Sequence, residues 1–392
     1  MKYDFITAPN RRNSGSSKWE GMKGLNPNVP EGVVPLSVAD MELKNPPEIL
    51  EGLKAYLDQA VLGYPCGTDS FYEAVESWTR RRYGWETKRE WLITTPGIVN
   101  AFHQAVLAYT EPGDGVILLT PVYYPFSFAV SRNDRKEVRC PLVNINGRYE
   151  IDYELLEEMA GKPENKLIIF CSPHNPVGRV WTREELRRLG EICLRHGVRV
   201  VADEIHCELV MPGFRYTPFA SLSEEFARRS VTCASPSKAF NLAGMQIANI
   251  VSADADVRTG IDRAINDNEV CDVNPFGVEA LMAAYDRGEE WLDRLREYLA
   301  DNYRMLCGFF AEYLPQYPVL PLEGTYLVWI DCRTTGVSSE QIAARLLAEA
   351  KLMISPGTIY GPGGEDFIRL NIACPRSLLE EGLLRLRKVL GR

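Results

Sequence analysis

The sequence lacks the features by which several classes of protein are recognised. No uninterrupted apolar stretch approaches the roughly 20 residues that a membrane-spanning helix requires. Its 10 cysteines form no C-x-x-C pair, and its four histidines show no metal-ligand spacing. We therefore expect no membrane span and no metal site, and we interpret the cysteines as reduced, structural thiols of a cytoplasmic protein.

Other absences narrow the function further. Neither the G-x-G-x-x-G motif nor the G-x-x-x-x-G-K-[ST] motif occurs, which argues against a dehydrogenase and against a P-loop protein. The net charge of −9 argues against nucleic acid or an anionic membrane as a partner. Residues 1–21 contain no apolar core after their charges, so we expect no secretory leader.

What the sequence does contain is an alternation of short apolar runs and amphipathic helical patterns. Such runs, separated by helices, are typical of a parallel sheet covered on both faces. The clearest helix begins at Thr182, forms a capping box with Glu185 and ends at Gly197. The fold class is therefore α/β, with the site expected beyond the carboxyl ends of the strands. The predicted strands are 115–120, 166–172, 198–203, 230–235 and 246–252.

The last hundred residues indicate a smaller α+β domain. A helical stretch over about 277–312 precedes a strand-like run at 323–331, and the chain ends with a helix from Ser377. The first fifty residues are rich in Pro, Gly and Asn and could not form a core alone. We predict three parts, which are an N-terminal segment (1–48) packed on the small domain, a large domain (49–285) and a small C-terminal domain (286–392).

Lys238 follows one of the apolar runs and is the only lysine between Lys166 and Lys351. Its small and apolar neighbours would desolvate it, which lowers the pKa of the amine and frees it as a nucleophile toward a carbonyl. A surface lysine at the end of a strand is the alternative, and the local sequence alone favours that alternative.

Two more polar residues follow apolar runs. The Asp203 carboxylate could pair with a protonated ring nitrogen, and the Asn175 amide could hydrogen-bond a phenolic oxygen. A capping aspartate and an ordinary Asn-Pro turn are the alternatives. The order of the residues favours a site, because Asn175, Asp203 and Lys238 recur at steps of 28 and 35 residues, the size of βα units. We expect all three to converge on one crevice.

Residues suited to a phosphate and to a flat ring lie near other strand ends. Gly97 precedes a helix that begins near Ile98, and a glycine-led helix N-terminus suits a phosphate. Ser235 and Ser237 could donate hydroxyls to the same phosphate, and Tyr123 could stack on a ring. A tight turn is the alternative for Gly97.

Arg369 lies inside an apolar strand pattern, where a guanidinium is costly unless it faces an anion. A bidentate grip on the α-carboxylate of a substrate is one use of such an arginine. An internal salt bridge to an Asp or Glu is the alternative.

Motif blocks occur in a fixed order along essentially the whole chain: NRRNSGSSKWE, VADME, GYPCGTDSFYEAV, TPGIVNAF, CSPHNPVGRVWTREEL, HGVRVVADEIH, SPSKAFNLAG, EGTYLVWID and RLNIACPRSLLEEG. In these blocks the sequence resembles the fold-type I pyridoxal-phosphate (PLP) enzymes of the class I/II aminotransferase superfamily. It is most similar to the MalY/PatB branch, the cystathionine β-lyase-like C–S lyases. The resemblance implies a mixed, mainly parallel sheet between helices, plus a small α+β domain.

The resemblance also implies roles for the residues around the cofactor ring. Lys238 would hold PLP as a Schiff base and then act as the acid and base at the substrate Cα. Asp203 would pair with the ring nitrogen, Asn175 with the ring oxygen, and Tyr123 would stack on the ring.

Further residues would bind the phosphate and the substrate. Tyr64 would reach the phosphate from the other subunit of a homodimer. Arg369 would bind the substrate carboxylate with help from Asn175, and Asp40 and Trp19 would line the substrate pocket. His206 follows the pattern of the branch without a required step. The remaining phosphate ligands would be Gly97, Ile98, Val99, Ser235 and Ser237.

The sequence departs from the branch at a few positions. Ser37 stands where many members have tryptophan, and Glu20 and Glu42 replace the usual aspartates of KWD and VADMD. These departures leave the size and side-chain preference of the substrate open. The phosphate-binding arginine that aminotransferases carry after the lysine is also absent, as in the branch.

The implied reaction is a β-elimination on cystathionine, cystine or S-alkyl cysteines that releases a thiol, pyruvate and ammonia. An aminotransferase on the same scaffold is the first alternative, because nothing in the sequence fixes which carbon is reprotonated. A regulatory or binding protein on this fold is the second, and the complete set of expected cofactor residues disfavours it.

Overall fold

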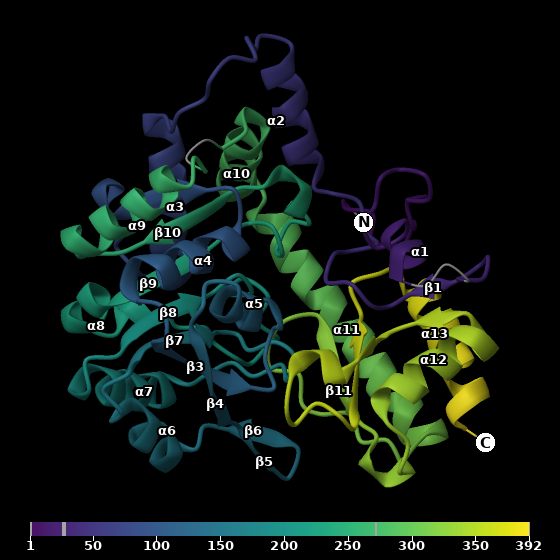
Figure 1. Cartoon of the computed structure of the whole chain (residues 1–392). Helices are drawn as coiled ribbons and strands as arrows, with labels where there is room; N and C mark the ends of the chain where they lie inside the picture. Colours follow the sequence, from purple (N-terminus) through teal and green to yellow (C-terminus); the bar gives the residue numbers. More distant parts are fainter. Residues whose placement is uncertain (1, 26–28, 271–272, 392) are drawn as a thin grey trace.

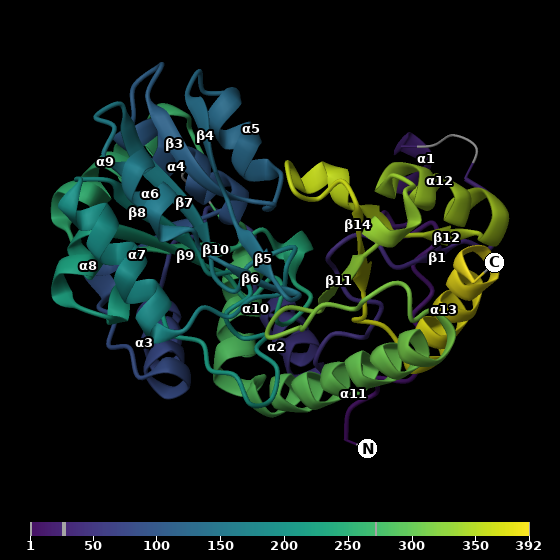
Figure 2. The same ribbon diagram turned by 90° about the horizontal axis from the view of Figure 1, so that it is seen from below.

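The computed structural model describes residues 2–25, 29–270 and 273–391. They form a large lobe and a smaller C-terminal lobe, joined by a long helix that runs beneath both (Figure 2). Nine cysteines in the described part are free thiols, while Cys271 lies outside the described residues. No helix in the ranges described is both long and apolar enough to cross a membrane.

A seven-stranded sheet forms the centre of the large lobe, with strand order β2-β10-β9-β8-β7-β3-β4. Six strands of this sheet run in the same direction and β10 runs opposite to them, so the predicted mixed, mainly parallel sheet is confirmed. Each of the five predicted apolar runs coincides with one strand of this sheet. The strands are β2 (Leu92–Thr95), β3 (Gly115–Thr120), β4 (Lys136–Pro141), β7 (Asn165–Cys171), β8 (Arg199–Asp203), β9 (Ser230–Ala234) and β10 (Ala248–Val251).

Helices cover both faces of this sheet (Figure 1). In β7, Ile168 and Phe170 face one apolar core, and Leu167 and Ile169 face the other, as alternation along a buried strand requires. The first core includes α6 (Tyr153–Ala160), α7 (Arg183–Arg195) and α8 (Glu224–Arg229). The second includes α4 (Ile98–Tyr109), α5 (Pro125–Ser131) and α9 (Ala255–Asp267). The predicted capping box of α7 is present.

The helical stretch predicted over about 277–312 is helical in the structure, but it is divided into two helices, α10 (Pro275–Arg287) and α11 (Glu289–Tyr313). Gly288 separates them. A Cβ on this residue would lie 2.6 Å from the Ala284 carbonyl oxygen and 2.7 Å from the Phe240 ring, so close packing leaves room for glycine alone. The helix α11 then crosses from the large lobe to the small one (Figure 1).

The small lobe is a three-stranded sheet, in the order β11-β14-β13, packed against helices. Its strands are β11 (Leu327–Asp331), β13 (Ser355–Pro356) and β14 (Phe367–Asn371), and its helices are α11, α12 (Ser339–Ala350) and α13 (Arg376–Leu390). A separate small hairpin, β5 (Val143–Ile145) with β6 (Arg148–Glu150), lies in the large lobe.

The N-terminal segment lies against this small lobe. β1 (Val34–Pro35) pairs in parallel with β12 (Leu352–Met353), and α1 (Gly21–Leu25) lies on the same side of the molecule as the small lobe (Figures 1 and 2). The chain then passes between the lobes and reaches α2 (Pro47–Leu57) and α3 (Asp69–Tyr83), which pack on α10. The division of the chain at residues 48 and 285 stays a prediction.

Candidate active site

A cavity of about 1020 Å³ lies where the carboxyl ends of the parallel strands face the small lobe and the N-terminal segment. The convergence expected from the sequence is therefore seen in space, across three separate parts of the chain. Nine of the candidate residues line the cavity: Gly97, Ile98, Val99, Tyr123, Asn175, Asp203, Ser237, Lys238 and Arg369.

Asp203 forms the floor of this cavity at the end of β8 and is only 1% exposed. Its carboxylate accepts a hydrogen bond from the Ile205 N–H at 3.1 Å. Burial raises the pKa of Asp203 to about 7, although that hydrogen bond and the charge of Lys238 both act to lower it. The ionised form of this carboxyl group is stabilised when a cation, such as a protonated ring nitrogen, lies beside it.

Lys238 follows β9 and points its amine across the cavity to the N-terminal segment. Its Nζ donates to the Ala39 carbonyl oxygen at 2.6 Å. Burial lowers the pKa of Lys238 to about 8, and the positive charge of Arg369 acts in the same direction, while Asp40 and Asp203 oppose it. A substantial neutral fraction near pH 8 makes the amine able to attack a carbonyl and to accept a proton.

Arg369 projects from β14 into the same cavity, where it is 5% exposed. Its donors reach neutral oxygens, namely Asn175 Oδ1 at 2.9 Å and the Ser37 carbonyl oxygen at 3.1 Å. No carboxylate pairs with it among the residues described, so the internal salt bridge considered above is not formed there. Its guanidinium also lies 4.8 Å from the centre of the Tyr360 ring. This buried positive charge is suited to a carboxylate ligand.

The residues predicted to bind a phosphate divide into groups that line the cavity and groups that support them. Gly97 takes a left-handed φ of 109° before α4. Because glycine has no side chain, the first-turn amides of α4 have no side-chain cap. Ser237 lines the cavity, whereas Ser235 lies behind it and shares a hydrogen bond with it at 2.7 Å. The Ser235 hydroxyl also donates to the Ile247 carbonyl oxygen at 2.7 Å, so this residue positions Ser237 within the protein.

Besides Ser235, three candidate residues are absent from the cavity wall. Trp19 donates its indole N–H to Glu42 at 3.0 Å, and Asp40 lines a second hollow of about 590 Å³ on the far side of the N-terminal segment. Tyr64 is 97% exposed in the connection between α2 and α3, far from any packing partner in its own chain. The roles of these three residues as ligands stay predictions.

Several residues that line the cavity were not among the predicted site residues. The carbonyl oxygens of Ser37 and Ala39 accept hydrogen bonds from Arg369 and Lys238, and a backbone oxygen gives no signal in a sequence. Tyr124 is 40% exposed and also lines the cavity. His206 also lines the cavity, and burial together with Lys238 and Arg369 lowers its pKa well below the usual range. Its three-residue spacing from Asp203 was the available signal.

The cavity wall also carries polar atoms that the protein does not satisfy. Of 16 buried side-chain atoms without a hydrogen-bond partner in the described part, six belong to residues that line this cavity. All of these atoms are themselves buried, so they lie behind the surface that a ligand in the cavity would meet. The six atoms are Ser37 Oγ, Thr120 Oγ1, His206 Nδ1, Thr358 Oγ1, Tyr360 Oη and Arg369 Nε.

Residues 31–386 match the family of class I and II aminotransferases, and the chain belongs to that family. Within it, the chain falls in the MalY/PatB branch. It is 43% identical to the cystathionine beta-lyase PatB of Bacillus subtilis (strain 168) over 358 residues, which cover 91% of this chain and 92% of that protein. It is 29% identical to the protein MalY of Escherichia coli (strain K12), with 97% of each chain covered.

Solved structures support the same placement. Cystalysin from Treponema denticola, whose structure contains a pyridoxal 5'-phosphate cofactor, matches with a TM-score of 0.97 and 41% identity, covering 100% of this chain and 99% of that one. The PLP-bound C-S lyase from Staphylococcus hominis matches with a TM-score of 0.92 and 33% identity, covering 99% and 98%.

Proposed function

We propose that this protein is a PLP-dependent C–S β-lyase that acts on cystathionine, cystine or related S-substituted cysteines. The observation that carries the proposal is one cavity that brings together Lys238, Asp203, Asn175 and an unpaired Arg369. The relatives and solved neighbours of the MalY/PatB branch support the same chemistry.

The cavity offers a place for each part of the cofactor. Lys238 would hold its aldehyde carbon, and Asp203 would face its ring nitrogen. Ser237 and the first amides of α4 would bind its phosphate, and Tyr123 would cover the ring. When bound, PLP supplies a conjugated ring that withdraws electrons from the substrate Cα.

The residues of the chain then divide the work of the reaction. Arg369 would bind the substrate carboxylate through its free donors, with its orientation fixed by Asn175. The Lys238 amine, released when the substrate amine takes its place, would remove the proton from Cα. The Cβ–S bond would then break with its electron pair on sulfur, which takes up a proton as the thiol leaves, and water hydrolyses the remaining fragment to pyruvate and ammonia.

The direct test is incubation of the purified protein with PLP and L-cystathionine, followed by assays of pyruvate and of free thiol. We expect equal amounts of both products and the loss of both in Lys238→Ala. Pyruvate and thiol that stay at background with cystathionine, cystine and S-methylcysteine would contradict the proposal.

An aminotransferase is the second candidate, because the matched family is named for that reaction. The two reactions differ in whether a group leaves from Cβ. A change in the visible absorbance of the bound cofactor without pyruvate, reversed by a 2-oxo acid, would favour the aminotransferase.

We further propose that the protein is a cytoplasmic homodimer in which Tyr64 reaches the phosphate of the partner's site. Tyr64 and its apolar neighbours Val61 and Leu62 are all exposed in the described chain, as a segment that covers another subunit would be.

A further inference from the structure

The cavity is closed on one side by residues 37–42, which we call the strap. Ser37, Val38 and Ala39 line the cavity that contains Lys238, whereas Asp40 lines the second hollow. The strap is therefore a thin wall between the candidate active site and the second hollow. It has no regular secondary structure, so its position depends on the bonds made to it.

Each of the five carbonyl oxygens from Ser37 to Met41 accepts a side-chain hydrogen bond. Two of them hold the functional cations, since the Ser37 oxygen accepts from Arg369 at 3.1 Å and the Ala39 oxygen accepts from Lys238 at 2.6 Å. Tyr326 also donates to the Ala39 oxygen at 3.1 Å. The strap thus fixes the distance between the amine and the guanidinium on which the chemistry depends.

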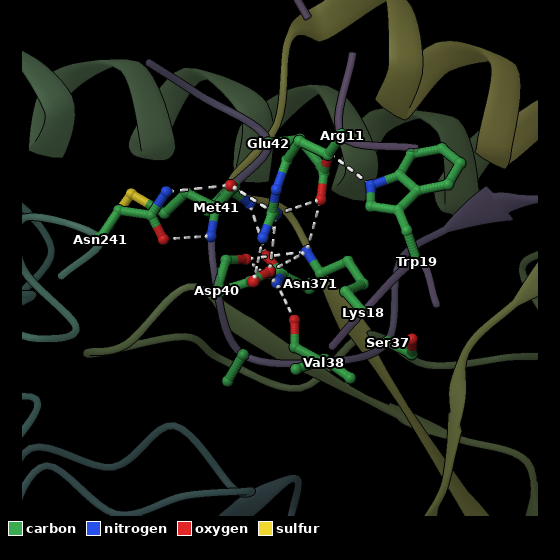
Figure 3. Close-up of polar contacts among 12 residues, drawn as sticks. Arg11, Lys18, Trp19, Ser37, Val38, Asp40, Met41, Glu42, Asn241 and Asn371 are labelled. Carbon is green, nitrogen blue, oxygen red and sulfur yellow. Dashed lines mark hydrogen bonds and ion pairs between the residues drawn. The ribbon is translucent and has the colours of Figure 1, made fainter. Parts of the chain in front are cut away.

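The other three carbonyl oxygens are held from outside the cavity. Asn371 donates to those of Val38 and Asp40, both at 2.7 Å. The Met41 carbonyl oxygen accepts from Asn241 at 3.1 Å, and the Met41 N–H donates back to Asn241 Oδ1 at 2.9 Å (Figure 3). Functional and anchoring bonds therefore share one short piece of backbone.

Four charged side chains, which we call the clasp, anchor the strap further: Arg11, Lys18, Asp40 and Glu42. Lys18 is 1% exposed and donates to Asp40 Oδ1 at 2.7 Å, to the Asp40 carbonyl oxygen at 2.9 Å and to Glu42 Oε1 at 3.2 Å. Arg11 bonds both carboxylates, with Nη2 2.6 Å from Asp40 Oδ2 and Nη1 2.7 Å from Glu42 Oε1. The clasp is neutral overall, and Trp19 supplies a further donor to Glu42.

The clasp is not expected to add much to the free energy of unfolding. Buried ion pairs lose hydration, and replacing them with apolar groups is often neutral or stabilising. What such a cluster provides is a fixed arrangement, because each carboxylate here is held by directed bonds from Arg11 and Lys18. Burial acts to raise the pKa of Asp40, but hydrogen bonds from Arg11 and Lys18 outweigh it and keep the pKa below its usual value.

We propose that the clasp is a positioning device for Lys238 and Arg369, which it holds through the main-chain carbonyl oxygens of Ser37 and Ala39. Lys18, Glu42 and Arg11 are positioning residues that do not touch the substrate, and Trp19 supports them through its hydrogen bond to Glu42. This inference rests on the proposed function, because it takes Arg369 as the carboxylate-binding group.

Two substitutions that change the net charge of the clasp in opposite directions test the inference. Glu42→Gln makes the clasp more positive and Lys18→Met makes it more negative. The probe is L-alanine, which has the carboxylate and amine of the substrates and lacks a leaving group on Cβ. Its dissociation constant from the PLP-loaded protein is read from the visible absorbance, and the melting temperature is measured alongside.

We expect both substitutions to weaken L-alanine binding by about 10-fold, because a displaced strap moves Arg369 and small misplacements have large effects. A long-range effect of charge would instead tighten binding in Glu42→Gln and weaken it in Lys18→Met, and would overturn the inference. Unchanged affinity in both variants, with a lower melting temperature, would also overturn it by leaving the clasp a purely structural role.

A matched control is Lys44→Met, which removes the exposed ion pair of Lys44 with Asp4 just beyond the strap and should leave the affinity unchanged. If either clasp variant fails to fold, Trp19→Phe is the milder change. It removes a single donor to Glu42, and we expect a smaller loss of affinity in the same direction. A wild-type protein that shows no absorbance change with L-alanine would contradict the proposed function itself, separately from the clasp.

Discussion

The floor and the strap side of the cavity are built by different means. On the floor, the strand ends that carry Asp203 and lead to Lys238 are placed by sheet register, with Cys171, Asp203 and Cys233 aligned across β7, β8 and β9. On the strap side, Arg369 bonds Ser37 across 332 positions of sequence. The floor is thus fixed by backbone pairing between strands. The position of the strap depends instead on side chains that hydrogen-bond to a segment without regular secondary structure. Changes on the floor should remove chemistry, and changes on the strap side should alter geometry and affinity.

The largest effect is expected on the floor. Lys238→Ala should lower pyruvate release from L-cystathionine by about 10³-fold or more, because it removes the base at Cα. Lys166→Ala is the control, since that lysine is exposed at the start of β7. If Lys238→Ala kept most of the wild-type rate, Lys238 would not be the base that removes the proton from Cα.

Across the cavity, Arg369→Lys should raise KM by about 100-fold and change kcat less, because lysine keeps the charge and loses the bidentate geometry. Steady-state kinetics with pyruvate detection checks this. The partly exposed Arg376 offers a control in Arg376→Lys. A fall in kcat at constant KM would mean that Arg369 acts on the reacting atoms and that the contrast between floor and strap side is wrong.

The proposed dimer predicts a smaller effect for Tyr64. Tyr64→Ala should weaken PLP binding about 10-fold, the value of one hydrogen bond to a charged group. Dimers that combine one Tyr64→Ala chain with one Lys238→Ala chain should recover a complete site, in which the lysine and the tyrosine come from different chains. Mixed dimers with no recovered activity would place Tyr64 outside the partner's site.

The smallest effect concerns stability. Because the folded-state pKa of Asp203 is raised to about 7, the folded protein binds this proton more tightly than the unfolded chain does. The cofactor-free protein should therefore lose stability as pH rises from about 4 to about 7. Asp203→Asn should raise the cofactor-free melting temperature by a few degrees at pH 8, with the difference vanishing near pH 3.

Melting curves across this pH range test the expectation, with Asp262→Asn on the exposed side of α9 as the control. A difference that is the same at pH 3 and pH 8 would mean that the ionisation of Asp203 is not its cause.

Much of the fold followed from local patterns. The apolar runs predicted the strands, and the capping box at Thr182 predicted α7, because both depend on residues close in sequence. The break between α10 and α11 was missed, since it depends on how closely Gly288 approaches the Phe240 ring. The same distinction separates the nine candidates found in the cavity from Ser235, Asp40 and Trp19, whose side chains are used by neighbours from other parts of the chain.

The sequence by itself determined the sheet, the family and the residue types that the chemistry needs, because strand ends of a parallel sheet must meet at one edge. Only the tertiary structure decided which of those residues face the cavity and that Ser37 and Ala39 hold the two cations through their carbonyl oxygens. Every residue has a carbonyl oxygen, so its function appears only when distant segments are brought within a hydrogen bond of it.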